Sequence, residues 1–349
     1  MSDKAVRSSP TLEDVAREAG VSRATVSRVI NGIRNVDPDI QDAVRRAIAA
    51  TGYVPNRAAR SLVTRRADSV ALVVSGAGDE DHEAGGEGGG VLADPFFGRV
   101  AGGVVGFLRP RGMHPVLMLA DSAEARKEVT AYLTQGRADG AVLASTHAAD
   151  PLPRQLADAG VPTVLFARPP SPMPVSYVDL AHQDGARLAA DHLVARGCQQ
   201  VATVTGPLDV LAGQDRLTGF RDAMARHGHP YVPTAEGNFT QESGERAMAR
   251  LLAQAPGLDG VFVANDLMAA GALHCLHAHG RRVPEDVAVV GFDDSSAAVS
   301  CRPSLTTVRQ PVEAMAGEMT RLLLERIADP GLRPTSVIFD PTLVVRQSA

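Results

Sequence analysis

The residues between Val21 and Val36 could contact DNA, because this stretch carries arginine and small hydroxyl side chains and no acidic residue. Arginine can donate two hydrogen bonds to N7 and O6 of guanine, and serine and threonine hydroxyls can donate to phosphate oxygens. The solvated face of an ordinary helical bundle, the alternative interpretation, would usually carry Glu and Lys pairs. We therefore favour DNA contact for the outward side chains, which are Arg23, Ala24, Thr25, Ser27, Arg28 and Asn31.

Three short helices are expected to hold these side chains. A capping box that begins at Thr11 starts the first helix, and Gly20 ends it because glycine readily adopts the left-handed conformation. Ser22 can cap a second helix, so two short helices flank a turn of about three residues, which is the spacing of a helix-turn-helix. A third helix is expected between Asp37-Pro38 and Gly52.

A further short helix is predicted at residues 56–63, with Asn56 as its cap. A helix of about seven residues is marginal in water, so we expect it to fold only against a partner. Leu62 is flanked by small residues and arginines, and this combination suits insertion into the minor groove of DNA as an apolar wedge.

Charge is divided unequally along the 349 residues. Residues 1–66 hold 12 Lys and Arg against 7 Asp and Glu, whereas residues 67–349 hold 23 against 33. A small basic segment beside a large acidic one is expected when one module meets phosphates. The length suits two or three domains, and the composition excludes wholesale disorder.

The sequence shows no sign of a membrane protein or of a disulfide-linked secreted protein. No apolar run reaches the roughly 18–20 residues needed to cross a bilayer, and the N-terminus lacks the apolar core of a signal peptide. Cys198, Cys275 and Cys301 form no CxxC pair, so neither a disulfide framework nor a zinc site is suggested. We expect a cytoplasmic protein with buried thiols.

From Ser69 onward, apolar β-branched runs alternate with helical segments of about 12–18 residues. This order predicts an α/β body of doubly wound parallel sheets with helices on both faces. The expected strands are 70–75, 115–120, 140–145, 162–166, 200–205, 260–264, 286–292, 305–308 and 342–346. The expected helices include 97–109, 122–135, 183–196, 214–227, 241–254 and 266–279.

Polar side chains follow several of these strands directly, at the edge where ligands of parallel sheets bind. Carboxylate, amide and guanidinium groups beside an aromatic ring suit a polyhydroxylated ligand, because they can bond neighbouring hydroxyls while the ring stacks on the apolar face of a sugar. Phe96 and Phe97 cannot both face a cleft, so one of them is expected in the core. The candidate ligand contacts are Phe96, Phe97, Arg168, Arg216, Asn265 and Asp293.

Several candidates also have an ordinary structural interpretation. Asn265 and Asp266 could cap the helix that follows them, with Asp266 as the expected cap. Asp293 and Asp294 could form a turn, and of the two we expect Asp293 to contact a ligand. Arg216 could instead be a surface ion-pair partner.

Three other patterns lack recognisable chemistry. The glycine-rich, acidic stretch Gly76–Asp94 has no P-loop pattern and would repel phosphate, so a flexible insertion is expected. His274, His277 and His279 lie near Cys275, but no carboxylate or thiol completes a metal site. Adjacent aspartates cannot flank a scissile bond, and no Ser-His-Asp arrangement is present. We expect neither an enzyme nor a metal or other cofactor.

Four motifs resemble the LacI/GalR family of bacterial transcription regulators, and the resemblance covers nearly the whole chain. They are Thr11-Leu12-Glu13-Asp14-Val15-Ala16, Gly20-Val21-Ser22, Thr25-Val26-Ser27-Arg28-Val29-Ile30-Asn31-Gly32 and Gly52-Tyr53-Val54-Pro55-Asn56.

The resemblance implies a role for each residue of the DNA-binding set. Arg23 and Ala24 would discriminate bases, and Arg28 would contact a base. Leu62 would be the lever that opens the central step of a palindromic operator, with Ala59 as a second minor-groove contact. The residues that would mainly contact phosphates are Ser22, Thr25, Ser27 and Asn31, and the DNA-binding set also includes Thr11 and Asn56.

The resemblance also implies a body similar to periplasmic sugar-binding proteins, with two subdomains that face a cleft. It places a helix-turn-helix head with its hinge helix at residues 1–66 and an effector-binding and dimerisation body at 67–349. Crossings are expected near Arg168, Gln310 and Asp340. They would give an N-subdomain of about 67–167 and 310–340 and a C-subdomain of about 168–309 and 341–349.

Family positions matching Arg216, Asn265 and Asp293 contact the effector sugar, and the position of Phe96 or Phe97 lines the cleft. Ala167, just before Arg168, departs from the carboxylate or polar residue that several relatives carry.

The expected function is that of a sugar-responsive, DNA-binding transcriptional repressor. It would be released from a palindromic operator by a disaccharide or oligosaccharide, and three residues after the last strand leave no room for a tetramerising tail, so a homodimer is expected. The segments 145–153, 205–210 and 308–311 resemble regulators of cellobiose or β-glucoside use, although xylan- or mannan-derived oligosaccharides stay open. The alternatives are a purine-type regulator whose ligand strengthens operator binding, and a transport sugar-binding protein.

Overall fold

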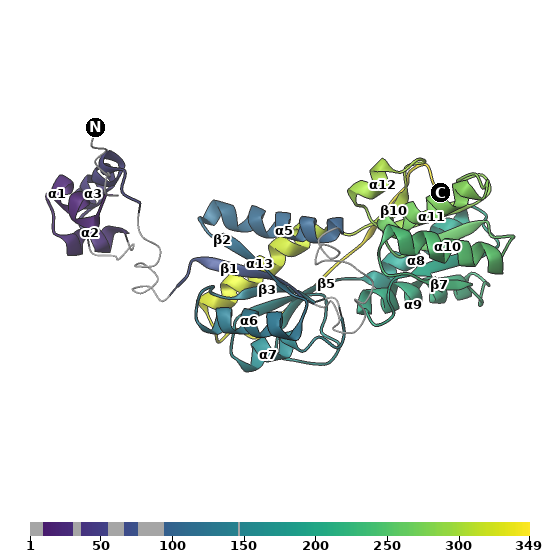
Figure 1. The fold of residues 1–349 in the computed structure, drawn as a ribbon, viewed down its shortest axis with the longest axis horizontal. Coiled ribbons are helices and arrows are strands. Elements are labelled where there is room, and N and C mark those ends of the chain that lie inside the picture. The colour runs from purple at the N-terminus through teal and green to yellow at the C-terminus, as the bar shows by residue number, and fades with distance from the viewer. Residues whose placement is uncertain (1–9, 31–35, 55–65, 76–93, 146) are drawn as a thin grey trace, which may run out of the picture. The chain divides into compact units, whose positions relative to one another are not determined.

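The computed structural model describes residues 10–30, 36–54, 66–75, 94–145 and 147–349. It divides into two compact units, a head up to Asp68 and a body from Ser69 to Ala349 (Figure 1). The predicted hinge at 56–63 and nearly all of the stretch Gly76–Asp94 lie outside the described residues.

Within its described residues, the head contains the three predicted helices α1 (Leu12–Ala19), α2 (Arg23–Ile30) and α3 (Pro38–Thr51). Thr11 and Asp14 form the predicted capping box, and Gly20 ends α1 in the left-handed conformation with φ 65°. Val15, Val26 and Val44 are fully buried and form one small core. The short turn between α1 and α2 confirms the helix-turn-helix spacing.

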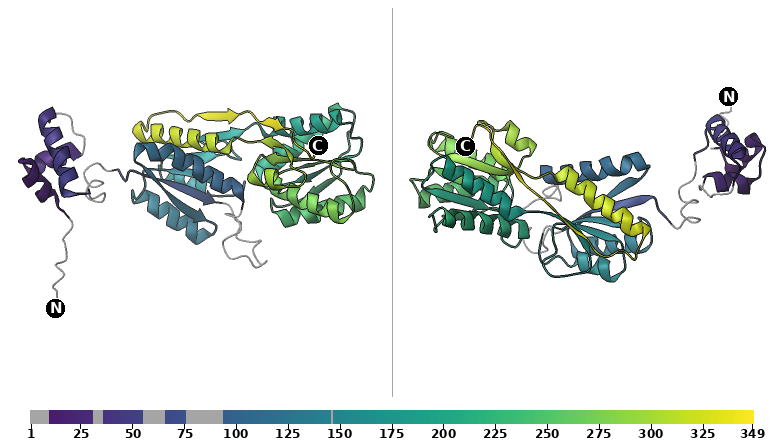
Figure 2. Two further views of the ribbon diagram at one scale, coloured as in Figure 1. Left: turned by 90° about the horizontal axis from the view of Figure 1, so that it is seen from above. Right: turned by 180° about the vertical axis from the view of Figure 1, so that it is seen from behind.

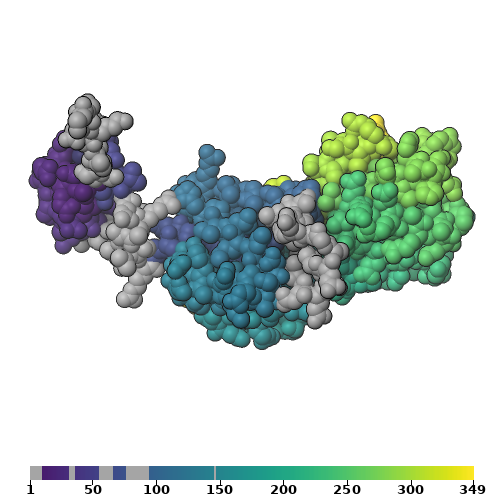
Figure 3. All heavy atoms as spheres, viewed as in Figure 1, coloured from purple at the N-terminus to yellow at the C-terminus, as the bar shows by residue number. Residues whose placement is uncertain are grey.

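The body contains two six-stranded sheets, each with its own set of helices. The first has the order β11-β5-β4-β3-β1-β2 and the second the order β12-β10-β9-β8-β6-β7. Every pair is parallel except β10 with β12. The two doubly wound lobes expected from the sequence are therefore present, and they form separate blue and green masses in Figure 3.

The strands of the first sheet are β1 (Ser69–Ser75), β2 (His114–Ala120), β3 (Ala141–Ser145), β4 (Thr163–Phe166), β5 (Ser176–Leu180) and β11 (Ser336–Phe339). Those of the second are β6 (Val201–Thr205), β7 (Thr234–Glu236), β8 (Gly260–Val263), β9 (Ala288–Asp293), β10 (Thr306–Arg309) and β12 (Thr342–Val344).

Helices cover both faces of each sheet because successive strand residues point to opposite sides. In β1, Val70, Leu72 and Val74 pack with residues of α5 and α13, whereas Ala71 and Val73 pack with residues of α6 and α7. Figure 2 shows α13 beside α5 in the first lobe. The bounds are α5 (Pro95–Leu108), 3-10 helix η2 (Arg109–Arg111), α6 (Ala123–Thr134), α7 (Leu152–Asp158) and α13 (Val312–Ala328).

The second lobe repeats this arrangement. Its helices are α8 (His182–Ala195), α9 (Leu211–Arg226), α10 (Gln241–Gln254), α11 (Asp266–Ala278) and α12 (Ser296–Ser300). Residues of α8 and α9 share one core with Phe262 and Phe292, and residues of α10 and α11 share another with Val261 and Val289. None of the described helices is long and apolar enough to cross a membrane.

The first crossing between lobes differs from the expectation. The chain does not leave the first sheet near Arg168, because β5 pairs with both β4 and β11. It continues in the first lobe to Leu180 and enters the second with α8. The proline-rich segment before Ser176 hid this strand, since proline cannot donate to a sheet. Gln310 and Asp340 do separate strands and helices of different lobes.

The packing of α10 on α11 depends on glycines at the crossing point. A Cβ added at Gly271 would overlap the carbonyl oxygen of Gln241, and one at Gly244 would overlap Met268. We expect Gly271→Ala to destabilise the body by about 3 kcal/mol, because the clash is with backbone that cannot rotate away. Gly317→Ala in α13 is the matched control, where a Cβ meets only ordinary van der Waals contact.

Chemical unfolding of both variants checks this prediction. Replacing a helical glycine that has room should stabilise by about 0.5–1 kcal/mol, so the two alanines should act in opposite directions. Equal unfolding midpoints for both variants would contradict the role of the crossing.

Candidate functional site

The first candidate site is the outward face of α2 in the head. The Ser22 hydroxyl accepts a hydrogen bond from the backbone N–H of Thr25 at 3.1 Å, so Ser22 caps the helix as predicted. Arg23 and Arg28 are exposed, and Nη1 of Arg23 lies 3.0 Å from the Glu13 carboxylate on α1. In the described part of the head, no acidic side chain pairs with Arg28.

The structure places the DNA-binding candidates as follows. Ser22, Arg23, Ala24 and Arg28 are exposed, and Thr25 and Ser27 are half-buried on the same helix. Thr11 is exposed at the start of α1, where its hydroxyl is 2.8 Å from the Asp14 carboxylate. The remaining candidates, Asn31, Asn56, Ala59 and Leu62, lie outside the described residues.

The second candidate site is in the body, around Arg216 of α9. This side chain is only 6% exposed, which rules out a surface ion pair. Its Cζ lies 3.7 Å from the centre of the Phe292 ring, and its Nη1 donates to the carbonyl oxygen of Ala264. Nη2 lies 3.6 Å from Oδ1 of Asp293 and donates to Oε1 of Gln310 at 3.3 Å. Burial lowers the pKa of Arg216, and the Asp293 carboxylate opposes that shift.

Asp293 ends β9 in an unusual backbone conformation, with φ 107°. Side chains other than glycine rarely adopt this region, so the surrounding structure must hold it in place. Burial raises the pKa of Asp293 well above its ordinary value, while Arg216 acts in the opposite direction. Asp294 has a different role, because its carboxylate pairs with Arg309 at 2.7 Å and with Arg346.

Asn265 is the cap of α11, and Asp266 is not, contrary to the expectation. Oδ1 of Asn265 accepts from the backbone N–H of Met268 at 2.9 Å, and Nδ2 donates to the carbonyl oxygen of Phe239 at 3.0 Å. Asp266 accepts instead from the Ser295 backbone and the Thr307 hydroxyl. Oδ1 of Asn265 can still accept one more hydrogen bond and Nδ2 can still donate one more, so capping is compatible with contact to a ligand.

Arg168 follows β4 and reaches across to the second lobe. Its Nη1 donates to Asp215 of α9 and lies 3.6 Å from Asp179 of β5, and its backbone N–H donates to Asp179 at 3.2 Å. Gln183 donates to the other oxygen of Asp215 at 3.1 Å. Ala167, before Arg168, has φ 75°. Arg168 is 40% exposed, so part of its guanidinium stays open to a ligand.

The two phenylalanines of α5 are separated as expected. Phe97 packs in the core, whereas Phe96 is half-buried and meets Phe166 edge to face with ring centres 5.0 Å apart. Asp94 caps α5 by accepting from the Phe96 backbone at 2.9 Å. Of the two rings, only Phe96 remains available as a platform for a sugar.

Sequence reasoning missed His182, which contacts the Arg216 guanidinium from the start of α8. Its Nδ1 accepts from Nε of Arg216 at 3.3 Å, so the ring proton lies on Nε2, which is 3.6 Å from Asp179. Burial lowers the pKa of His182 well below its ordinary value, and the ring is therefore neutral. Finding β5 would have pointed to His182, which follows the end of this strand, and to Asp179 within it.

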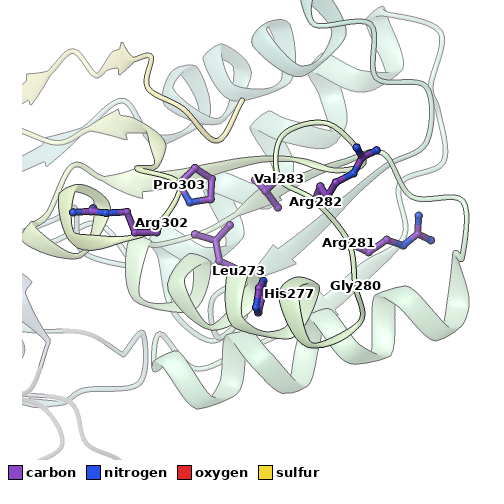
Figure 4. A pocket seen from close by; sticks show the side chains of 8 residues that line it. All are labelled: Leu273, His277, Gly280, Arg281, Arg282, Val283, Arg302 and Pro303. Atoms are coloured by element: carbon purple, nitrogen blue, oxygen red, sulfur yellow. The ribbon is translucent and has the colours of Figure 1, made fainter.

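A separate hollow of about 360 Å³ lies on the second lobe and contains none of the predicted site residues. The guanidinium groups of Arg281 and Arg282 point away from it in Figure 4, toward Pro256 and Asp286. Its lining is Leu273, His277, Gly280, Arg281, Arg282, Val283, Arg302 and Pro303. No group of metal-binding side chains occurs among the described residues.

Comparison with known proteins agrees with both halves of this description. Residues 11–56 match the family described as bacterial regulatory proteins, lacI family, and residues 190–349 match the periplasmic binding protein-like domain. The chain is 46% identical to the HTH-type transcriptional regulator CelR of Thermobifida fusca, covering 98% of this chain and 99% of that one. It is 32% identical to the ribose operon repressor of Escherichia coli K12, covering 97% and 99%.

Two solved structures are also similar. A transcriptional regulator CelR–cellobiose complex has a TM-score of 0.75 at 44% identity, covering 97% of this chain and 100% of that one. The lac repressor dimer bound to operator and the anti-inducer ONPF has a TM-score of 0.82 at 27% identity, covering 98% and 99%. The chain therefore belongs to the lacI family of bacterial regulatory proteins.

Proposed function

We propose that this chain is a dimeric transcriptional repressor that leaves a palindromic operator when a disaccharide or oligosaccharide binds in the body. The observation that carries the proposal is the buried cluster of Arg216, Asp293 and Asn265 at the carboxyl ends of the second sheet. These groups supply charged and neutral hydrogen-bond partners where ligands of parallel sheets bind. Phe96 supplies an aromatic edge from the first lobe.

A cellobiose-like ligand is favoured over other sugars. The solved relative with 44% identity is a complex with cellobiose, and the relative with 46% identity is also called CelR. The hydroxyls of a disaccharide need alternating donors and acceptors, which Arg168, Arg216, Asn265 and Asp293 provide.

The head would bind one half of the operator and a second copy the other half. Arg23 and Ala24 sit at the start of α2, where a recognition helix contacts base edges, and Arg28 follows on the same exposed face. Glu13 holds Arg23 in the absence of DNA and would have to release it on binding. We assign residues 1–66, with the hinge at 56–63, to this role in the cytoplasm, and the rest to ligand binding and dimerisation.

The two activities are linked by the arrangement of the lobes. A sugar that binds one arrangement better shifts the population toward it, and the operator favours the other. By thermodynamic linkage, operator and sugar then weaken each other by the same factor.

A corepressed regulator is the second candidate, because the chain is 31% identical over 97% of its length to the repressor PurR of Escherichia coli. In that case the ligand would strengthen operator binding.

The sign of the ligand effect separates the two functions. Fluorescence anisotropy would measure binding of the full chain to palindromic DNA obtained by in vitro selection, with and without cellobiose. We expect cellobiose to weaken binding by about 5- to 150-fold. Stronger binding would support the corepressed regulator. No effect of cellobiose, ribose or xylo- and manno-oligosaccharides would refute sugar-responsive repression.

Arg216→Lys should weaken cellobiose binding by about 10- to 100-fold, because lysine keeps the charge near Asp293 but loses the planar donors and the stacking on Phe292. Isothermal titration calorimetry measures this effect, and thermal unfolding checks the fold. Arg221→Lys on the exposed side of the same helix is the control. A folded Arg216→Lys variant with unchanged affinity would remove Arg216 from the ligand site.

Arg28→Ala should reduce operator affinity by about 1–3 kcal/mol and relax specificity at one base pair, as expected for loss of a base contact. Arg45→Ala on α3 is the control, since Arg45 is exposed and pairs with Asp42. A uniform loss over all sequences, together with a shallower salt dependence, would instead assign Arg28 to phosphate.

A further inference from the structure

Arg99 of α5 makes an unusually complete set of hydrogen bonds for a residue that faces no predicted ligand. Its Nε and Nη2 donate to the two oxygens of Glu313 at 2.7 and 2.9 Å. Nη1 donates to the carbonyl oxygen of Asp293 at 2.8 Å, and Nη2 also donates to that of Gln310 at 3.0 Å. A guanidinium has five N–H groups, so these bonds occupy most of its donors.

The partners of Arg99 belong to different parts of the body. Glu313 lies on α13, which packs against α5 in the first lobe so closely that a Cβ at Gly103 would overlap the Glu313 backbone. Asp293 ends β9 of the second lobe, and Gln310 lies where the chain crosses back to the first. Arg99 therefore joins the two lobes at the end of a central strand.

The two carbonyl groups that Arg99 contacts belong to residues whose side chains meet Arg216. Oδ1 of Asp293 lies 3.6 Å from Nη2 of Arg216, and Oε1 of Gln310 accepts from the same nitrogen. The Asp293 backbone also needs support, because its φ of 107° is unfavourable for a side chain other than glycine. Arg99 supplies a charged donor to that peptide from the opposite lobe.

We propose that Arg99 is a positioning residue that transmits the state of the ligand site to the arrangement of the lobes. It does so by holding the Asp293 and Gln310 peptides against α5, with Glu313 fixing the guanidinium in place. This inference rests on the proposed function for its biological meaning, but the contact between lobes can be tested without a sugar or an operator.

Two other pairs of charged or ionisable side chains join the lobes among the described residues, and neither contacts the Asp293 peptide. Nδ1 of His147 lies 2.7 Å from Asp209, and Arg168 pairs with Asp215. Arg321 binds Glu318 and Glu325 on its own helix and makes no ion pair with the other lobe. Arg321 therefore offers a matched control for loss of an Arg–Glu interaction on α13.

The experiment measures the distance between the lobes by electron–electron double resonance. Nitroxides are attached at Glu128→Cys on α6 and Tyr231→Cys in the second lobe, both exposed, in a Cys301→Ser background. Labelled chains are diluted with unlabelled ones so that distances within one chain dominate. Arg99→Met, Arg99→Lys and Arg321→Met are compared with the parent chain, each with and without cellobiose.

We expect Arg99→Met to shift or broaden the distance distribution of the sugar-free protein, with Arg321→Met matching the parent. Lysine has one nitrogen and cannot span the same acceptors, so Arg99→Lys should resemble Arg99→Met. In operator binding, the factor by which cellobiose changes affinity should fall by about 5-fold or more in both Arg99 variants.

Parent-like distances in both Arg99 variants would overturn the proposal. Parent-like distances in Arg99→Lys alone would also overturn it, because a simple charge pair with Glu313 would then be sufficient. If Arg99→Met fails to fold, Arg99→Lys decides. Failure of the proposed function gives a different result. Cellobiose would then leave operator binding by the parent chain unchanged, while the distances measured without sugar would still differ in the Arg99 variants.

Discussion

The body depends on a guanidinium that is buried and still charged. Removing Arg216 from water is unfavourable unless its nitrogens find partners, and Nε, Nη1 and Nη2 each donate one hydrogen bond to a group from a different element. His182 from α8, Ala264 at the end of β8, Gln310 from a lobe crossing and the Phe292 ring all converge on it. Because these partners come from separate elements, the Arg216 side chain links those elements at the carboxyl ends of the second sheet.

The contacts between the lobes are partly apolar and partly charged. One buried apolar cluster includes residues of both lobes, and hydrogen-bonded charged side chains also link them. Hydrogen bonds of this kind can be exchanged without opening a core, so two arrangements of the lobes can differ little in free energy. A ligand that contacts groups from both lobes can then select between them.

The helices and strands with strong periodicity could be predicted from the sequence, and so could the polar residues that follow those strands. The helix-turn-helix is local, since its caps, glycines and apolar positions all lie between Thr11 and Gly52. The missed parts depend on distant partners. β5 and β11 are short strands whose paired residues lie 159 positions apart, and the failure to find β5 placed the first crossing near Arg168 and hid His182. Asn265, and not Asp266, caps α11, and the Asp266 carboxylate instead accepts from Ser295 and Thr307, which are distant in the sequence.

Asn265 and Phe96 are both candidate ligand contacts, but they tolerate substitution to different degrees because Asn265 also has a structural role. Its amide both caps α11 and donates to the Phe239 carbonyl oxygen, so an apolar residue there would lose both bonds and loosen a helix that belongs to the core of the second lobe. Phe96 makes no such capping contact, and its half-buried ring packs against Phe97, Phe166 and the apolar core. We therefore expect changes of sugar specificity during evolution to occur more readily at Phe96, whereas Asn265 is retained.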